Sequence, residues 1–362
     1  ATSGQSKPYF LTIPDVLLVM ELGYLDQNFL GRGQELKVPL EYGFSTTTPL
    51  RLFQIRPRWT IRRAFNTDLT LELNTRLIYA DRVSEVKDFS EYSVGTTLTY
   101  PVLKEMAISA EVSGGLLRFE EPDTENIFDP TSGTYEPFLR TTLRWRWDNT
   151  DNPLHPTTGF ALSTALSYIV DNELEGQRVI SRNFLKWDVT AKVAQKIPPG
   201  FILALFARYG GSDADEDAPL PTQERYTLGN SNGMRGFADD AVGRYAKDGT
   251  LLATAPSSGF DYGGNILING SLELRIPLIE QAGIWMVSFF DWGALAANHQ
   301  EIYPKSFRFS AGLGLRYLLM NQIPVRLDWG AVIGDLRCQS YDEASIEAGS
   351  PLCERAEDRT AV

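Results

Sequence analysis

Residues 307–317 read FRFSAGLGLRY, and this stretch indicates the fold class. Its odd-numbered positions carry Phe, Phe, Ala, Leu, Leu and Tyr, whereas its even-numbered positions carry Arg, Ser, Gly, Gly and Arg. Successive side chains of a β-strand point to opposite faces, so this alternation predicts a strand with one apolar face and one polar face. An apolar face with aromatic ends, opposite a face of charged and small residues, is typical of a sheet between lipid and a hydrated interior.

The same alternation recurs along the whole chain and predicts fourteen strands. We expect them at residues 15–24, 35–44, 48–59, 68–80, 91–100, 105–119, 136–148, 159–170, 182–193, 200–210, 265–278, 283–293, 305–319 and 323–334. Short connections alternate with long ones such as residues 171–181, and membrane barrels have short periplasmic turns and long external loops. The sequence therefore predicts an all-β, antiparallel transmembrane β-barrel, a single domain over residues 1–362 with residues 211–264 as its longest external loop.

The strand count also predicts where the ends of the chain lie. If short turns are periplasmic, residues 1–14 and 335–362 both fall on the external side. A complete barrel of this class normally has an even number of strands and both ends in the periplasm. We therefore expect a barrel of sixteen strands, two of which lie outside this chain or are supplied by another chain.

The composition excludes two other classes of protein. Hydrophobic residues make up 43% of the chain and charged residues 22%, and there is no apolar run of about 18 residues, which a transmembrane helix would need. A barrel needs no such run, because only alternate residues of its strands face lipid. The net charge of −12 argues against a nucleic-acid partner, which would require a basic surface. We expect a bacterial-type outer-membrane location with outer-membrane lipids as partners.

Cysteine and acidic residues give two weaker predictions. Cys338 and Cys353 are the only cysteines, and a close pair of this kind predicts a local disulfide in an oxidising compartment, within one external loop. We expect neither a cofactor nor a metal site with them, because His155 and His299 lie far away in the sequence. The acidic group Asp213, Asp215, Glu216 and Asp217 could bind calcium, although a solvated external loop is the simpler interpretation.

The long loop contains the sharpest local motif, GNSNGMRGF at residues 229–237. Its first five residues fit G-x-S-x-G, the nucleophile turn of many hydrolases. That motif requires a strand–turn–helix context and His and Asp partners, and no helix is predicted after it, so we expect no catalysis. On the strands that follow, Ser271, Glu273 and Arg275 share the inward face by pattern, and Asp291 lies inward on the next strand.

Several further motifs stand in a fixed order along the chain. They are NFLGRG (28–33), WDNTDNPLHPTTG (147–159), GGN (263–265), SLELRIP (271–277), FFDWG (289–293), RFSAGLG (308–314) and PVRLDWG (324–330). Together with residues 229–237, this series resembles the BamA-like superfamily of outer-membrane assembly and translocation barrels over nearly the whole chain. In the resemblance, the loop motif comprises Gly229, Gly233, Arg235, Gly236 and Phe237, and the periplasmic turn motif comprises Asp148, Asp151, Asn152, Pro153, Pro156 and Gly159.

The resemblance implies a function without a cofactor or a catalytic step. The loop is expected to fold into the lumen, where Arg235 meets Glu273, Asp291 or both, and Phe237 packs beside it. The barrel is expected to insert or export client outer-membrane proteins through a lateral seam, with possible accessory lipoproteins or periplasmic subunits as partners. The family's periplasmic repeat domains are expected to lie outside this chain.

Three other functions fit parts of this pattern. A two-partner secretion pore and the barrel anchor of a fused patatin-like enzyme share the same motifs. A plain porin is the third, since the inward arginines Arg56, Arg58, Arg144, Arg146, Arg308 and Arg316 could select anions as a channel lining does. We favour pairing of these arginines with inward Glu and Asp residues, because charges in a lumen need partners or water.

Overall fold

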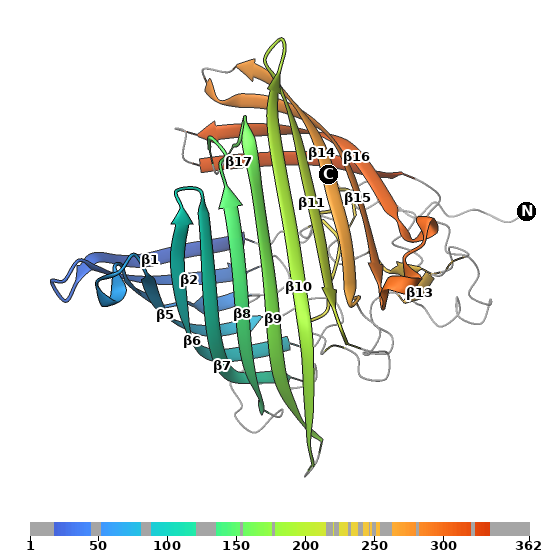
Figure 1. Ribbon diagram of the computed structural model, residues 1–362. Helices are drawn as coiled ribbons and strands as arrows, with labels where there is room; N and C mark the ends of the chain where they lie inside the picture. Colours follow the sequence, from blue (N-terminus) through green and yellow to red (C-terminus); the bar gives the residue numbers. More distant parts are fainter. Residues whose placement is uncertain are drawn as a thin grey trace, which may run out of the picture.

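A computed structural model describes residues 18–44, 52–80, 88–120, 135–152, 155–175, 178–214, 220, 224–230, 233–237, 242–245, 247, 251–253, 263–279, 282–319 and 323–333. In this part of the chain, the long strands pair with their neighbours along the chain as antiparallel partners in one strongly curved sheet (Figure 1). Its first half consists of β1 (Leu18–Phe29), β2 (Gln34–Phe44), β3 (Leu52–Ile55), β4 (Arg58–Ile61), β5 (Thr70–Ala80), β6 (Asp88–Leu103), β7 (Met106–Glu120), β8 (Tyr135–Asp148) and β9 (Gly159–Glu175).

The second half contains the strands that surround the long loop. These are β10 (Arg178–Ile197), β11 (Phe201–Ser212), β14 (Ile266–Ile279), β15 (Ile284–Ala296), β16 (Arg308–Leu319) and β17 (Ile323–Ile333), with the short β12 (Arg244–Tyr245) and β13 (Leu251–Ala253) inside the loop. Because β11 pairs directly with β14, residues 213–265 form an insertion at one end of these strands. If β3 and β4 count as one interrupted strand and the two loop strands are left aside, the described sheet has the fourteen predicted strands.

Two details of the strand prediction are wrong. The strand expected at residues 48–59 is divided at Arg56 and Pro57, because proline has no N–H for the ladder; residues 45–51 lie outside the described part. The sheet remains continuous there, since the Arg56 N–H donates to Pro39 O at 3.1 Å. The long loop expected at residues 171–181 is instead the tip of the β9–β10 hairpin, whose pairing continues from Asp171↔Arg182 to Glu175↔Arg178.

The sheet is apolar outside and polar inside, as predicted. On the outer face Leu313 and Leu327 are 52% and 65% exposed, whereas Asp291 and Ser310 on the inner face are 0% exposed. A water-soluble protein shows the reverse arrangement, because it buries its large apolar side chains and leaves its charges in water. The arrangement stabilises the protein where lipid surrounds the sheet and water or polar groups fill its interior.

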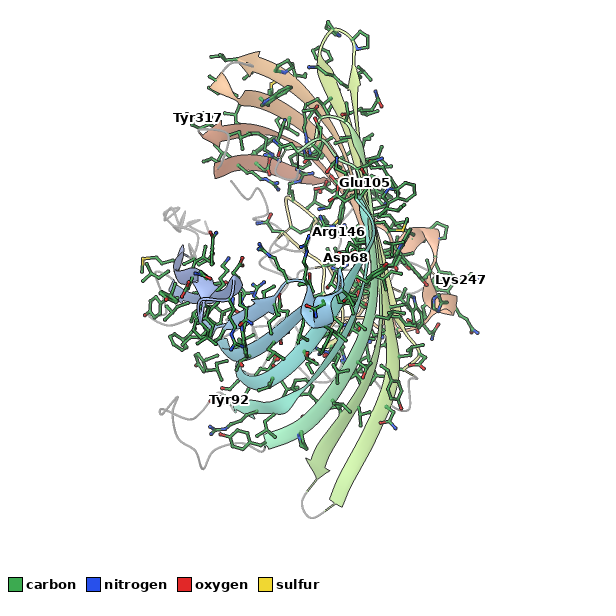
Figure 2. The ribbon with its side chains drawn as sticks, turned by 60° about the vertical axis from the view of Figure 1, so that its left-hand side comes forward. Asp68, Tyr92, Glu105, Arg146, Lys247 and Tyr317 are labelled. Carbon is green, nitrogen blue, oxygen red and sulfur yellow. The ribbon has the colours of Figure 1, made fainter. Side chains whose placement is uncertain are left out.

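The two ends of the sheet are separate in the described part of the chain. β1 pairs with β2 and β17 pairs with β16, and no pairing joins β1 to β17 among these residues. Figure 2 shows the curved sheet with its first and last strands at different edges. The sixteen-strand barrel stays a prediction. The described helices are short 3-10 turns such as η4 (His299–Glu301) and η5 (Pro304–Ser306), and none is long and apolar enough to cross a membrane.

Candidate functional site

The long loop turns inward through a tight bend at Gly229–Gly233. The Met234 N–H donates to Gly229 O at 2.8 Å, and Gly233 adopts a φ of +104°. A Cβ at Gly233 would lie 2.6 Å from Asn269 Oδ1, and the same Asn269 side chain donates to Gly233 O at 3.2 Å. Only glycine combines this backbone conformation with this close approach, so the motif places the loop directly against β14.

Gly236 brings the loop equally close to the last strand. Its φ is +88°, and a Cβ there would lie 2.8 Å from the carbonyl carbon of Gly330 on β17. Gly330 has the complementary restriction, since its own Cβ would lie 2.9 Å from the Gly236 nitrogen. The two glycines therefore allow backbone to pack on backbone on the inner side of β17.

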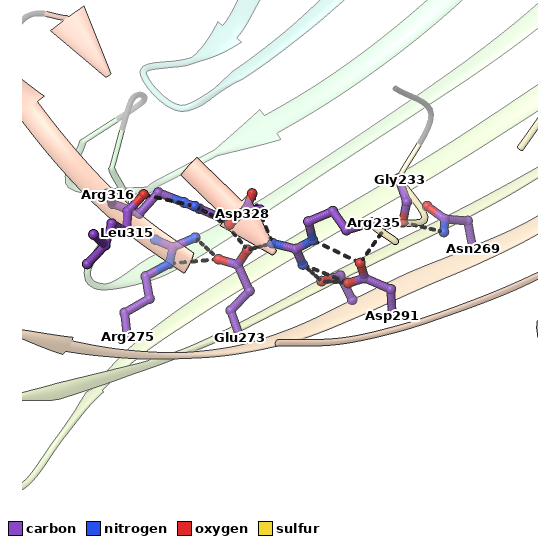
Figure 3. Close-up of polar contacts among 10 residues, drawn as sticks. Gly233, Arg235, Asn269, Glu273, Arg275, Asp291, Leu315, Arg316 and Asp328 are labelled. Atoms are coloured by element: carbon purple, nitrogen blue, oxygen red, sulfur yellow. Dashed lines mark hydrogen bonds and ion pairs between the residues drawn. The ribbon is translucent and has the colours of Figure 1, made fainter. Parts of the chain in front are cut away.

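Arg235 lies between these two glycines and points into a cluster of polar side chains (Figure 3). Its Nε and Nη2 donate to Asp291 Oδ2 and Oδ1 at 2.8 and 2.7 Å, which is a bidentate pair. Its Nη1 donates to Glu273 Oε1 at 2.6 Å, and Nη2 also donates to Ser271 Oγ at 2.7 Å. The structure thus places Arg235 on both carboxylates that the resemblance implied, one from β14 and one from β15.

The charges around Arg235 balance. Arg275 Nε donates to Glu273 Oε2 at 2.9 Å, and Arg316 ion-pairs with Asp328 and, at 3.4 Å, with Glu273. Asp328 Oδ2 also lies 3.8 Å from Arg235 Nη1. Three guanidinium groups therefore meet three carboxylates, on β14, β15, β16, β17 and the loop. We call these residues the Arg235 anchor: Arg235, Ser271, Glu273, Arg275, Asp291, Arg316 and Asp328.

The aromatic neighbour of Arg235 is a different residue from the one expected. The guanidinium carbon lies 3.7 Å from the centroid of the Phe289 ring, close enough for a cation–π contact. Phe237, which was expected beside Arg235, belongs to a buried apolar cluster with Tyr226, Leu228, Met234, Val242, Leu267 and Leu295. Arg235 and Phe237 therefore contact different parts of the inner surface, the polar cluster and the apolar cluster respectively.

A second polar cluster fastens the beginning of the loop to the opposite part of the sheet. Glu224 ion-pairs with Arg140 of β8 and with Lys186 of β10, whose Nζ also donates to Glu224 O at 2.6 Å. The Tyr226 hydroxyl donates to Asp188 Oδ2 at 2.9 Å. We call Arg140, Lys186, Asp188, Glu224 and Tyr226 the Glu224 anchor.

The Glu224 anchor was missed in the sequence. Glu224 and Tyr226 are 8% and 4% exposed, but the sequence predicted no inward partner for either residue. Burial, and then the neighbouring Asp188, raise the pKa of Tyr226 well above its usual range, so its hydroxyl stays a donor at neutral pH. The sequence shows here an aromatic residue after two charged ones, Glu224 and Arg225, and this does not specify a partner.

The periplasmic turn motif lies between β8 and β9, and its acidic side chains hold the turn together. Asp151 Oδ1 accepts from the Thr157 N–H at 2.8 Å, and Asp148 Oδ1 accepts from the Thr150 N–H at 3.1 Å. Burial alone would raise the pKa of Asp151, but hydrogen bonds from Thr157 and Thr158 outweigh it and lower the pKa. These carboxylates therefore act as caps of backbone N–H groups.

The remaining residues of the turn motif complete this arrangement. Asn152 Oδ1 accepts from the His155 N–H at 3.2 Å, and Gly159 has a φ of +113° in a place where a Cβ would lie 2.7 Å from Asn149 O. Pro156 O accepts from Arg275 Nη1 at 3.1 Å, so the turn reaches the Arg235 anchor across the lumen. Pro153 lies outside the described residues.

Other sequence predictions fall partly or wholly outside the described part of the chain. Cys338 and Cys353 lie there, and so do Asp215, Glu216 and Asp217 of the acidic group. Asp213 is described, and its Oδ1 accepts from the Leu185 N–H at 2.6 Å. Within the described ranges, no group of three or more His, Cys, Asp or Glu residues could hold a metal ion.

The inward arginines mostly pair with carboxylates rather than line an open anion channel. Arg56 pairs with Glu41 and Arg144 with Glu111, both within the first half of the sheet. Arg146 pairs with Asp148 at 2.6 Å. Neutralised charges of this kind stabilise a hydrated lumen but give little selectivity for anions.

The apolar outer face, the polar lumen and the anchored loop define an outer-membrane β-barrel whose interior is occupied by its own chain. A family model described as the Omp85 superfamily domain matches residues 28–345, and the chain belongs to this superfamily. It is therefore a protein of the bacterial outer membrane. No curated protein matches the sequence.

One solved structure shows the same fold, and a second is less similar. BamA from Haemophilus ducreyi lacking POTRA domains 1–3 has a TM-score of 0.66 and 18% identity, and the match covers 90% of this chain and 68% of that one. CdiB from Acinetobacter baumannii has a TM-score of 0.44 and 12% identity, and that match covers 88% of this chain and 62% of the other. At 18% identity the likeness to BamA concerns the fold alone.

Proposed function

We propose that this barrel inserts client outer-membrane proteins into the membrane, and that it acts through a lateral seam at the edges of β1 and β17. The observation that carries the proposal is the combination of an occupied lumen with separate sheet edges. The loop crosses the lumen between its two anchors, which is unfavourable for a plain porin. Among the described residues, β1 and β17 each have one strand neighbour, so the seam lies on the outer side of these two strands, where the two further strands of the predicted barrel would also stand.

A free edge in a membrane favours strand addition. Unpaired backbone N–H and C=O groups cost several kcal/mol each in lipid, and an incoming strand that pairs with them removes this cost. The proposal therefore needs no catalytic step and no cofactor. It assigns the chain client outer-membrane proteins and lipids as partners, and it leaves room for lipoprotein or periplasmic subunits that deliver the clients.

The test is a client-insertion assay with site-specific crosslinking. Purified protein in lipid vesicles is mixed with an unfolded small barrel protein, and a photo-crosslinking residue replaces Leu22 on β1 or Val94 on β6. Both positions are strongly exposed, at 71% and 65%, but only Leu22 lies on an edge strand. We expect faster client folding with the vesicles, and crosslinks from Leu22 several-fold above those from Val94.

Other outcomes would contradict this proposal in distinct ways. Client crosslinks from the inward position Lys192, without any at Leu22, would favour passage through the lumen, as in a secretion pore. Equal crosslinks at Leu22 and Val94, with no change in client folding rate, would exclude insertion by this chain.

A further inference from the structure

A cavity of about 690 Å³ lies in the lumen beside the Arg235 anchor. Its wall includes the cationic residues Lys192 of β10, Arg275 of β14, Arg316 of β16 and Arg326 of β17. His155 of the β8–β9 turn also lines it. Arg316 and Arg326 lie close to the β16–β17 turn, so the cavity is on the side of the short turns, which are periplasmic in this class of barrel. Its volume is in the range that accommodates a small ligand or part of a peptide.

The cavity contains more positive charge than its carboxylates neutralise. Glu273 and Asp328 are already engaged by the three arginines of the Arg235 anchor. Arg326 makes no hydrogen bond and no ion pair with any residue that the structure describes. It also lies directly opposite Arg316 in the β16–β17 ladder, where like charges destabilise the pairing.

Lys192 adds a second unneutralised cation. It is exposed to the cavity and has no ion-pair partner within the described ranges. The chain as a whole carries a net charge of −12, so this local excess of positive charge runs against the general balance. Both groups retain N–H donors that a negatively charged oxygen would accept.

His155 supplies a further polar atom at the same cavity. Its Nε2 is buried and has no hydrogen-bond partner in the structure, while the ring packs 5.0 Å from Trp285. Burial, followed by the charge of Arg275, lowers the pKa of His155 to about 4, so the ring is neutral at pH 7. In the tautomer with its proton on Nε2, the ring donates a hydrogen bond without adding charge.

We propose that this cavity is an oxyanion site, which binds a phosphate or carboxylate group with Arg326 as the principal donor and with Lys192 and His155 as additional donors. A guanidinium group binds either oxyanion in a bidentate manner, and the uncompensated charge of Arg326 gives the site its preference for anions. The inference concerns the resting lumen and does not depend on which clients the barrel handles.

The experiment is calorimetric titration of the whole chain in a zwitterionic detergent at low salt, with pyrophosphate as the probe. We expect saturable binding by the unchanged protein and about tenfold or greater weakening in Arg326→Gln, because a charge-assisted pair is lost. The matched control is Arg62→Gln, an arginine that pairs with Glu35 at 2.7 Å and does not line the cavity. This variant should bind pyrophosphate as the unchanged protein does.

A second probe distinguishes the source of the anion. A hexapeptide of aspartate is titrated beside its asparagine counterpart; tighter, Arg326-dependent binding of the aspartate peptide assigns the site to polypeptide carboxylates. Binding of pyrophosphate alone assigns it to phosphate. If Arg326→Gln does not fold, Lys192→Gln, at an exposed position, should weaken binding of the same probe.

A proton NMR titration gives an independent readout, because the chain has only two histidines. A bound oxyanion should raise the pKa of His155 above its value of about 4, and Arg326→Gln should abolish that change. The proposal is overturned if the unchanged protein binds neither probe, or if Arg326→Gln and Lys192→Gln both bind as the unchanged protein does.

Discussion

The two anchors both hold the long loop against the inner face of the sheet, but they do so through different contacts. In the Arg235 anchor, one guanidinium group makes bonds to three side chains of two strands, and glycines on both sides bring the backbone close. In the Glu224 anchor, a carboxylate receives Arg140 and Lys186, and an adjacent tyrosine hydroxyl donates to Asp188. The first depends on one central residue, whereas the second divides its contacts between two.

This difference predicts unequal sensitivity to mutation. Removal of Arg235 leaves the buried Asp291 without a cation among the described residues, and it takes from Glu273 one of its three cations. When two residues share the contacts, removal of one leaves the other in place. The Arg235 anchor should therefore be the more fragile of the two, although both hold the same loop.

The largest expected effect is that of Arg235→Ala. It leaves Asp291, which is 0% exposed, without an ion-pair partner among the described residues, and we expect a loss of about 3–5 kcal/mol in the free energy of unfolding. Protease cleavage within residues 211–264 should accelerate in parallel. Urea unfolding of the protein in lipid vesicles and timed proteolysis measure the two effects.

The control for this change is Arg62→Ala. Arg62 also pairs with a glutamate, but its side chain is 69% exposed, and such pairs contribute about 0–1 kcal/mol. Equal losses in the two variants would mean that Arg235 is a solvated loop residue, and the comparison of the anchors would fail.

A smaller effect is expected for Tyr226→Phe in the Glu224 anchor. The change removes the hydrogen bond to Asp188 but keeps the ring, which lies 4.5 Å below Lys186 Nζ. We expect a loss of about 1–2 kcal/mol, because the acceptor is charged while Glu224 keeps its own partners. Hydrogen exchange at residues 224–228 should rise more than at residues 233–237, and an equal rise in both segments would show that the loop opens as one unit.

The third effect, which is absent at neutral pH, is a dependence on pH that reaches only the Arg235 anchor. The pKa of His155 is lowered from 6.5 to about 4, so the folded turn resists a proton that the unfolded turn accepts. The stabilisation is complete above pH 6.5 and is lost as the pH falls toward 4. The turn contacts Arg275 through Pro156, whereas no contact with the Glu224 anchor is present in the described structure.

Hydrogen exchange measured between pH 7 and pH 4 tests this dependence, after correction for the intrinsic exchange rates. Protection at Thr157 and Thr158 should decrease across the window, while protection at Tyr226 stays constant. His155→Gln, which does not titrate, should show no such decrease. A parallel decrease at Tyr226 would indicate a general acid effect on the loop.

The strands could be predicted because one face of the sheet is apolar, so apolar and polar side chains alternate along each strand. Residues 307–317 show it plainly, and β16 occupies Arg308–Leu319. The prediction failed at the β9–β10 tip, where Asp171, Asn172 and Glu173 interrupt the pattern. The strand pairing continues through these residues although they do not alternate in hydropathy. The hydropathy pattern therefore could not predict the pairing there.

The residues of the site could be predicted where strand alternation or closely spaced glycines marked them. Glu273 and Asp291 lie inward by strand register, and the glycines around Arg235 mark a close approach. Asp328 and Phe289 could not be assigned to Arg235, because the twist of four strands determines which inward side chains meet. The Glu224 anchor was not predictable for a similar reason, since its partners are separated from it by 84 and 38 positions.

The position of each anchor along the chain has a consequence for the order of folding. The partners of Glu224 and Tyr226 precede the loop, in β8 and β10, whereas the ion-pair partners of Arg235 follow it, in β14, β15 and β17. The chain emerges from synthesis and export with its N-terminal end first. The beginning of the loop can therefore dock when residues 135–226 have formed, and Arg235 must wait for a strand that ends at Ile333. Docking of Arg235, which closes the lumen, should therefore come after docking of the Glu224 anchor.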